Sequence, residues 1–184
     1  EFDSFSDPED SSGYAANDLI SLGWKHSAKH MELINNSKKL TDVNAKDYNA
    51  VFFVGGQSPM LTFRGNKEVT DFTVNFFESG KPTALVCHST CVLLDAKDSK
   101  GKYIVEGKTW TGFANSEEEY AESFTGGKIQ PFWIETEAGK IKNTNFIVKE
   151  AFTPFAIADG NLITGQQQNS GSEAAKLVIK QLEK

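Results

Sequence analysis

Two short runs, residues 50–54 (AVFFV) and 83–86 (TALV), are apolar on both faces of an extended chain. A strand of this kind must be covered on both sides, which is typical of parallel strands inside an α/β sheet. Parallel neighbours need a crossover, and residues 66–79 supply a helical pattern between the two runs. Asn66 suits the N-cap of that helix, and Gly80 suits the position just after its end. The sequence therefore predicts a β-α-β unit.

Helical and extended segments alternate along the rest of the chain. Helices are expected at residues 27–36, 87–94 and 131–138, a helix start at 115–119, and a last helix at 172–182; strands are expected at residues 109–112, 146–148, 155–158 and 161–164. The Asp159-Gly160 pair is a strong signal for a hairpin between the last two strands. The predicted fold class is α/β, with a largely parallel sheet covered on both faces.

Composition and charge restrict the classes of partner. The 184 residues suffice for one domain with a core, and they include 25 acidic against 19 basic residues, for a formal net charge of −6. This balance disfavours binding to nucleic acid or to an anionic membrane surface. Arg64 is the single arginine, so bidentate clamps on phosphates are nearly unavailable. No nucleic-acid or membrane partner is expected.

The two cysteines, Cys87 and Cys91, lie four residues apart on one predicted helix, where a disulfide is geometrically awkward. Such a pattern suits a reducing compartment. No apolar run approaches the length of about 20 residues that spans a bilayer, and residues 1–13 lack the basic and then apolar pattern of a signal peptide. A cytoplasmic protein is expected.

Cys87 stands where the second buried strand passes directly into a helix. This strand-to-helix turn is the arrangement of a nucleophile elbow, which exposes one side chain above the carboxyl ends of the sheet. The helix N-terminus favours a thiolate, and the adjacent His88 could hold its proton. The alternative is a small buried residue at a strand end, since free cysteines are often buried. Cys91, one helical turn further on, is expected to pack in the core.

Three other features are candidates for chemistry. The Gly55-Gly56 pair ends the first buried strand at the same sheet edge as Cys87, and it is either one wall of an oxyanion hole or a plain turn. His26 and His30 are spaced to share one helical face, but no third metal ligand is evident, so a solvated face is favoured. The acidic run at residues 117–119 is expected to be a solvated first turn of a helix.

Four ordered motifs carry a resemblance to a known family: VFFVGGQSPM, GKPTALVCHSTCVLL, VEGKTWTGFANSEEE and ADGNLITGQQQNS. In that order and spacing they resemble the ThiJ/PfpI superfamily, and within it the branch of glutathione-independent glyoxalases (glyoxalase III) and stress chaperones. The match runs from about Asp7 to the C-terminus. The resemblance implies a flavodoxin-like three-layer sandwich with a strand-Cys-helix nucleophile elbow.

The same resemblance implies a site. Cys87 would be the nucleophile, His88 its proton partner, and Glu118 the acidic residue that fixes the His88 tautomer. Gly56 and Ser89 are the expected oxyanion or substrate contacts. Neither a metal nor an organic cofactor is implied. Departures at Gln57-Ser58 and Ser89-Thr90, where the family has His-Gly and Gly-Pro, point to a different pocket polarity.

The implied activity is conversion of methylglyoxal, a small α-oxoaldehyde, to lactate, which protects against carbonyl stress. Three alternatives remain open on the sequence. The same cysteine, histidine and glutamate could hydrolyse amides or peptides, Cys87 could be the oxidisable thiol of a stress chaperone or redox sensor, or the chain could be a binding module without chemistry.

Family members begin with a strand, a helix and a second strand, and the first strand ends near a glutamate that transfers protons beside the cysteine. Residues 1–184 are therefore expected to form a single domain that lacks its first β-α-β unit. That unit would come from a separate or removed fragment of the same protein, and its absence would leave open edges at residues 51–54 and 83–86. A homodimer is the expected oligomer.

Overall fold

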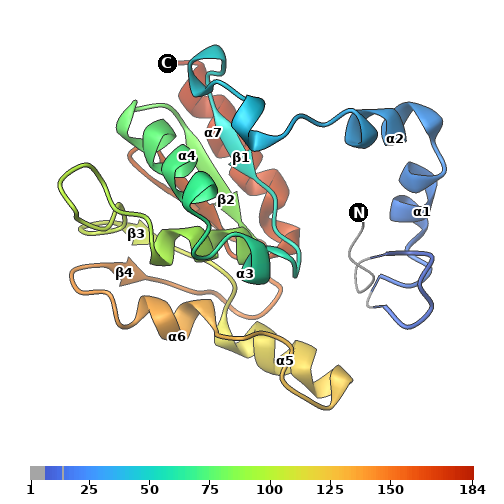
Figure 1. The fold of residues 1–184 in the computed structure, drawn as a ribbon. Helices are drawn as coiled ribbons and strands as arrows, with labels where there is room; N and C mark the ends of the chain where they lie inside the picture. The colour runs from blue at the N-terminus through green and yellow to red at the C-terminus, as the bar shows by residue number, and fades with distance from the viewer. Residues whose placement is uncertain (1–6, 14) are drawn as a thin grey trace. The chain divides into compact units, whose positions relative to one another are not determined.

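The structure, a computed structural model, describes residues 7–13 and 15–184 (Figure 1). The chain forms two compact units with a boundary after Val43, and each unit is described by itself. Within the described ranges, no helix combines the length and the apolar character that crossing a membrane requires. The second unit contains the central sheet and all of the predicted site residues.

The first unit is helical. Helices α1 (Leu19–Lys25) and α2 (Ala28–Asn35) are followed by a short 3-10 turn, η2 (Leu40–Asp42). The Asp18 carboxylate caps α1 by accepting the Ser21 N–H at 3.0 Å. No residue of α1 or α2 is buried, so the predicted helix at residues 27–36 is confirmed but adds nothing to the core.

His26 and His30 do not share a helical face. His26 ends α1, Ser27 is extended, and His30 lies in α2, so the expected common face is wrong. His26 Nε2 lies 3.0 Å from a Glu9 carboxylate oxygen, and the His30 ring stacks on Trp24 with ring centroids 4.7 Å apart. Among the described residues, no three His, Cys, Asp or Glu side chains are grouped to hold a metal ion.

The sheet of the second unit has four strands in the order β1-β2-β6-β5. These strands are β1 (Val51–Phe53), β2 (Thr83–Val86), β6 (Leu162–Gly165) and β5 (Ala156–Asp159). β1 and β6 both pair with β2 in parallel, whereas β5 pairs with β6 antiparallel. The β5–β6 hairpin turns at Gly160, whose φ is +64°. The predicted α/β class, the mostly parallel sheet and the hairpin are confirmed.

One expectation about the sheet edges is wrong. β2 is an interior strand because it pairs with β1 on one side and β6 on the other, so residues 83–86 form no open edge. All four β2 residues are buried. β1 pairs only with β2 within the part of the chain that the structure describes. A separate N-terminal unit beside β1 stays a prediction.

Helices cover both faces of this sheet. α4 (Lys67–Glu78) packs against β2, and α7 (Gly171–Leu182) packs against β2, β5 and β6 on the opposite face (Figure 1). Asn66 caps α4 by accepting two backbone N–H groups of its first turn, as predicted. α7 turns Ala174 and Val178 into the core. The result is the three-layer arrangement that the resemblance implies.

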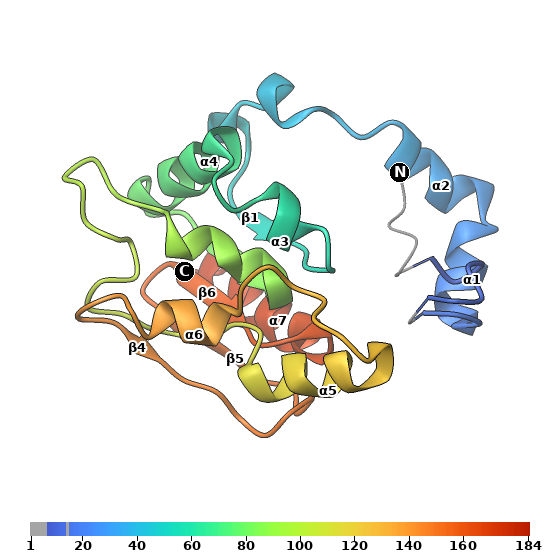
Figure 2. The same cartoon turned by 60° about the horizontal axis from the view of Figure 1, so that its bottom comes forward.

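A second, smaller group of elements lies beside the sheet. It comprises the parallel pair β3 (Thr109–Trp110) and β4 (Asn145–Phe146), the helices α5 (Asn115–Thr125) and α6 (Ile134–Ala138), and the 3-10 helix η4 (Cys87–Leu94). Short elements elsewhere are η3 (Ala45–Asp47), α3 (Pro59–Thr62) and η5 (Gln168–Ser170). α6 packs against η4 and α5 (Figure 2). All eight residues of η4 are buried. The start of η4 and the first turn of α5 carry the predicted site.

Candidate active site

The turn from β2 into η4 holds Cys87 in a left-handed conformation, with φ of +62°. An L-residue keeps this conformation only where its surroundings enforce it. The Thr90 hydroxyl donates to the Cys87 carbonyl oxygen at 2.7 Å. The Ser89 hydroxyl accepts the Val86 N–H at 2.9 Å and lies 2.9 Å from the Phe53 carbonyl oxygen. These bonds fix Cys87 at the carboxyl end of β2, where the strand-to-helix pattern predicts it.

Ser89 is fully buried, and backbone groups occupy its hydroxyl. A substrate could therefore meet Ser89 only through its backbone. The expected contact of Ser89 with substrate is therefore limited to its backbone groups, and it stays a prediction.

The loop after β1 touches the cysteine directly. A Cβ added to Gly55 would lie 2.6 Å from Cys87 Cβ and 2.7 Å from the Val86 carbonyl oxygen, so only glycine fits there. The next residue, Gly56, is exposed and has a φ of +106°, which favours glycine. The glycine pair and Cys87 thus share one sheet edge, as predicted. The role of the Gly56 N–H as an oxyanion donor stays a prediction.

Gly55→Ala is expected to displace the turn that holds Cys87. The added methyl group would meet backbone as well as side chain, and such overpacking costs about 1–3 kcal/mol of folding free energy. Gly127→Ala is the matched control, because nothing lies within 4 Å of its added Cβ. Thermal unfolding and the alkylation rate of Cys87 are the measurements. Equal behaviour of the two variants would contradict the close packing.

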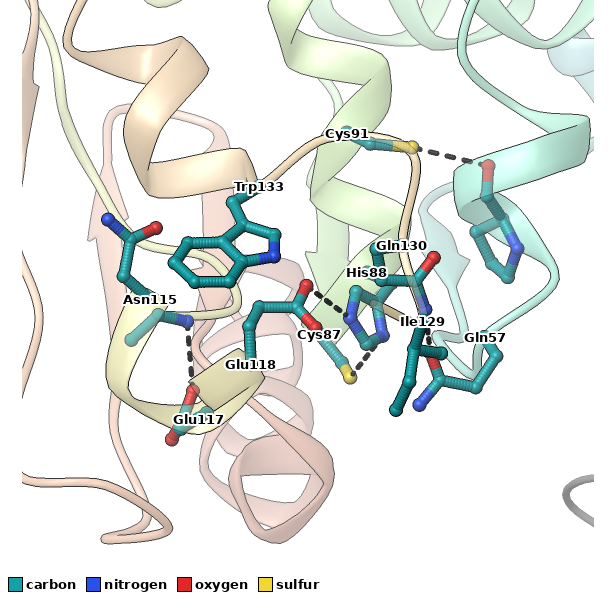
Figure 3. A network of polar contacts seen from close by, with 12 residues as sticks. Gln57, Cys87, His88, Cys91, Asn115, Glu117, Glu118, Ile129, Gln130 and Trp133 are labelled. Carbon is teal, nitrogen blue, oxygen red and sulfur yellow. Dashed lines mark hydrogen bonds and ion pairs between the residues drawn. The ribbon is translucent and has the colours of Figure 1, made fainter. Parts of the chain in front are cut away.

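His88 lies between the cysteine and a carboxylate (Figure 3). Its Nδ1 is 3.6 Å from Cys87 Sγ, and its Nε2 is 3.0 Å from Glu118 Oε1. The imidazole is 1% exposed and stacks on the Phe113 ring at a centroid distance of 4.0 Å. Burial lowers the pKa of His88, but the Cys87 sulfur and the Glu118 carboxylate outweigh it and raise the pKa from 6.5 to about 9. The ring is therefore an imidazolium at neutral pH.

Glu118 reaches His88 from the first turn of α5. Both Glu117 and Glu118 are 0% exposed, whereas Glu119 is exposed. The expectation of a solvated acidic turn is therefore wrong for the first two residues, because the turn faces the interior beside η4. Glu118 Oε2 has no hydrogen-bond partner within the described residues. The contact of Oε1 with His88 is therefore the one polar contact of the Glu118 side chain among those residues.

Cys91 is not part of this constellation. It is 0% exposed, and its thiol donates to the Pro59 carbonyl oxygen at 3.4 Å. Burial raises the pKa of Cys91 to about 12, which keeps the thiol protonated and unreactive. The prediction that Cys91 packs in the core is confirmed. It serves as an internal control for every experiment on Cys87.

Two features of the site were not predicted. Phe113 stacks on His88 and restricts the rotation of its ring. Gln130, which is 3% exposed, donates its side-chain amide to that of Gln57 in the loop after β1 (Figure 3). Neither residue type in isolation signals a site. The position of Gln57 two residues after Gly55 is the one clue that places it near the cysteine.

The arrangement combines three chemical capacities. In this arrangement the Cys87 sulfur can act as a nucleophile at the carboxyl end of the sheet, His88 can give and take a proton beside it, and Glu118 can stabilise the imidazolium and orient the ring. These are the parts needed for addition of a thiolate to a carbonyl carbon. The same parts serve both aldehydes and acyl compounds.

Known proteins share the sequence pattern and the fold of this chain. The model of the DJ-1/PfpI family matches residues 23–181. "Probable glutathione-independent glyoxalase hsp3104" of Schizosaccharomyces pombe is 29% identical over 150 residues, which cover 81% of this chain and 68% of the relative. "Probable glutathione-independent glyoxalase hsp3103" of the same yeast is 28% identical over 154 residues, and the chain spans 59% of its length.

Two solved structures share the fold. Rapid Encystment Protein 24 KDa of Francisella tularensis matches with a TM-score of 0.80 at 24% identity, covering 93% of this chain and 74% of the other. Glyoxalase III of Candida albicans matches with a TM-score of 0.71 at 22% identity, covering 94% of this chain and 72% of the other. The family model covers most of the sequence. The chain belongs to the DJ-1/PfpI family.

Proposed function

We propose that this protein is a glutathione-independent glyoxalase that converts methylglyoxal and similar small α-oxoaldehydes to hydroxy acids. The observation that carries the proposal is the contact of the Cys87 sulfur with an imidazolium, His88, that is itself held by a buried carboxylate, Glu118. Relatives that carry the glyoxalase name support the choice of substrate class.

In the proposed reaction, the Cys87 thiolate adds to the aldehyde carbon of methylglyoxal and forms a hemithioacetal. The Nδ1 atom of His88 lies beside the sulfur to which the adduct is attached. His88 can therefore donate its proton to the oxygen of the adduct that becomes negative. The Gly56 N–H in the neighbouring loop stabilises the same oxygen before it is protonated. The negative charge that develops on this oxygen is thereby neutralised within the buried site.

The second half of the reaction moves hydrogen between the two carbons. A base removes the proton from the former aldehyde carbon, an enediol forms, and reprotonation of the neighbouring carbon gives a lactoyl thioester. Water then hydrolyses the thioester, releasing lactate and the Cys87 thiol. Methylglyoxal and one water give one lactic acid, so the reaction needs no oxidant and no reductant. Among the described residues, His88 is the titratable side chain in contact with the sulfur.

Hydrolysis of amides is the second candidate function. The tetrahedral adduct of an amide would use the same thiolate and the same proton from His88, and the glycine loop against Cys87 suits its oxyanion equally well. The two activities differ in product. A hydrolase would form an acyl-enzyme with amides and release no lactate from methylglyoxal.

The proposal predicts lactate from methylglyoxal in the absence of glutathione. The assay uses the purified protein with any fragment that co-purifies with it, and product is identified as lactate by chromatography. Lactate that accumulates in proportion to enzyme supports the glyoxalase. Hydrolysis of an amide substrate without lactate formation would overturn it in favour of the hydrolase.

A further inference from the structure

The two buried glutamates of α5 face different surroundings. Glu118 is directed at His88, whereas Glu117 is directed away from it (Figure 3). Glu117 is 0% exposed, and no ion pair to it occurs within the described residues. Burying a carboxylate without a cation is costly unless N–H donors surround it. The role of Glu117 is therefore to be sought in its hydrogen bonds.

Three N–H donors meet the Glu117 carboxylate. Its Oε2 accepts the Ala114 N–H at 3.0 Å, and its Oε1 accepts the Phe152 N–H and the Gln166 side-chain amide, both at 2.9 Å. Gln166 is itself 0% exposed and uses its amide oxygen to accept the Lys149 N–H at 2.7 Å. One carboxylate thus ties the start of α5 to the segment after β4 and to the end of β6.

One of these donors lies in a strained segment. Phe152 has a φ of +61°, a left-handed conformation that a bulky residue adopts only under constraint. Its N–H is held by Glu117 and its carbonyl oxygen accepts the Asn169 side-chain amide at 3.0 Å. Hydrogen bonds to the N–H and to the carbonyl oxygen of Phe152 together hold this strained conformation. Such over-determined segments are rigid, so they can fix the helix turn that is bonded to them.

We infer that Glu117 is a positioning residue for the catalytic unit, and that its three N–H bonds hold the first turn of α5 so that Glu118 meets His88. The Glu118 side chain has no polar contact besides His88 within the described residues. Its placement therefore depends on the backbone of the turn, which Glu117 anchors. The inference rests on the proposed roles of Cys87, His88 and Glu118.

Glu117→Gln tests the inference at nearly constant volume. An amide offers one oxygen where the carboxylate offers two, so its NH₂ group must face at least one N–H donor. The turn should shift, the contact between Glu118 and His88 should loosen, and the imidazolium should lose stabilisation. A misplacement of about 1 Å can reduce a rate by about 100-fold, so a smaller shift is expected to reduce it by about tenfold.

The readout is alkylation of Cys87 by iodoacetamide as a function of pH, which needs no substrate. We expect Glu117→Gln to slow alkylation at neutral pH by about tenfold and to move the midpoint of the profile to higher pH. Glu118→Gln should act in the same direction, because it removes the charge that stabilises the imidazolium. Glu119→Gln, which changes the exposed neighbour, should leave the profile unchanged.

A double-variant cycle separates positioning from a general structural effect. If Glu117 acts through Glu118, then Glu117→Gln combined with Glu118→Gln should react as slowly as Glu118→Gln alone. Additive slowing would overturn the inference, because it would show that Glu117 influences His88 or the fold independently. A normal profile for Glu117→Gln beside an altered one for Glu118→Gln would also overturn it. Normal profiles for both variants would instead refute the proposed catalytic unit.

Gln166→Met provides a second route in case Glu117→Gln does not fold. Methionine has the same chain length as glutamine but lacks both the NH₂ group that donates to Glu117 and the oxygen that accepts the Lys149 N–H. The same cycle with Glu118→Gln should show the same lack of additivity. Additive effects there would contradict the positioning role as directly as in the first cycle.

Discussion

Replacing Cys87 with alanine is expected to abolish turnover of methylglyoxal, lowering kcat by about 10⁴-fold or more. The reason is that no other group of the described site can form the covalent adduct: His88 and Glu118 are committed to each other, and Ser89 is bonded to backbone. The variant removes one sulfur atom and leaves the turn intact. Lactate formation under single-turnover and steady-state conditions measures the loss.

Cys91→Ala is the matched control for that experiment. Cys91 is equally a free thiol, but it is 0% exposed and bonded to the Pro59 carbonyl oxygen. Its removal should lower stability by about 1 kcal/mol, as a small core truncation does, and leave turnover near the wild-type value. A loss of activity in Cys91→Ala that matches the loss in Cys87→Ala would contradict the assignment of the nucleophile.

Glu118→Gln is expected to lower kcat by about 100-fold with little change in stability. The amide keeps the shape of the side chain but cannot stabilise the His88 imidazolium. The wild-type pKa of about 9 lies above the ordinary value of 6.5, so the imidazolium persists at neutral pH and is lost as the pH rises through 9. Without the carboxylate this pKa falls, and the alkaline limb of the rate profile should move to lower pH.

Measurement of kcat between pH 6 and pH 10 for wild type, Glu118→Gln and Glu119→Gln tests this prediction. Glu119 is exposed on the same helix, so its variant controls for the loss of one acidic charge. A Glu118→Gln profile that coincides with the wild-type profile would remove Glu118 from the site.

Much of the central sheet could be predicted because it rests on local patterns. The two runs that are apolar on both faces became β1 and β2, and the Asp159-Gly160 turn became the β5–β6 hairpin. The spacing of apolar residues does not predict the buried face of a helix where two of its faces are similarly apolar. In α7 the large apolar residues Ile179 and Leu182 are 55% and 49% exposed, while the smaller Ala174 is buried. Which face a helix buries is decided by the sheet against which it packs.

The site was partly predictable for a similar reason. Parallel strands place their carboxyl ends at one edge, so Gly55 and Cys87 had to meet there. Burial of Glu117 and Glu118 could not be read locally, because an acidic first turn is usually solvated. Only the packing of α5 beside η4 and the donors from distant segments make their burial tolerable. The Glu118 assignment came from the resemblance and not from the pattern.

The central claim is that the Cys87 sulfur attacks the substrate, and mapping its alkylation in the presence of substrate tests it most directly. Protein treated with iodoacetamide at neutral pH, with and without methylglyoxal, is digested and the labelled peptides are identified by mass spectrometry. The account predicts label on Cys87, none on the buried Cys91, and slower labelling of Cys87 when methylglyoxal is present. Labelling of Cys87 at a rate that methylglyoxal does not change would contradict it.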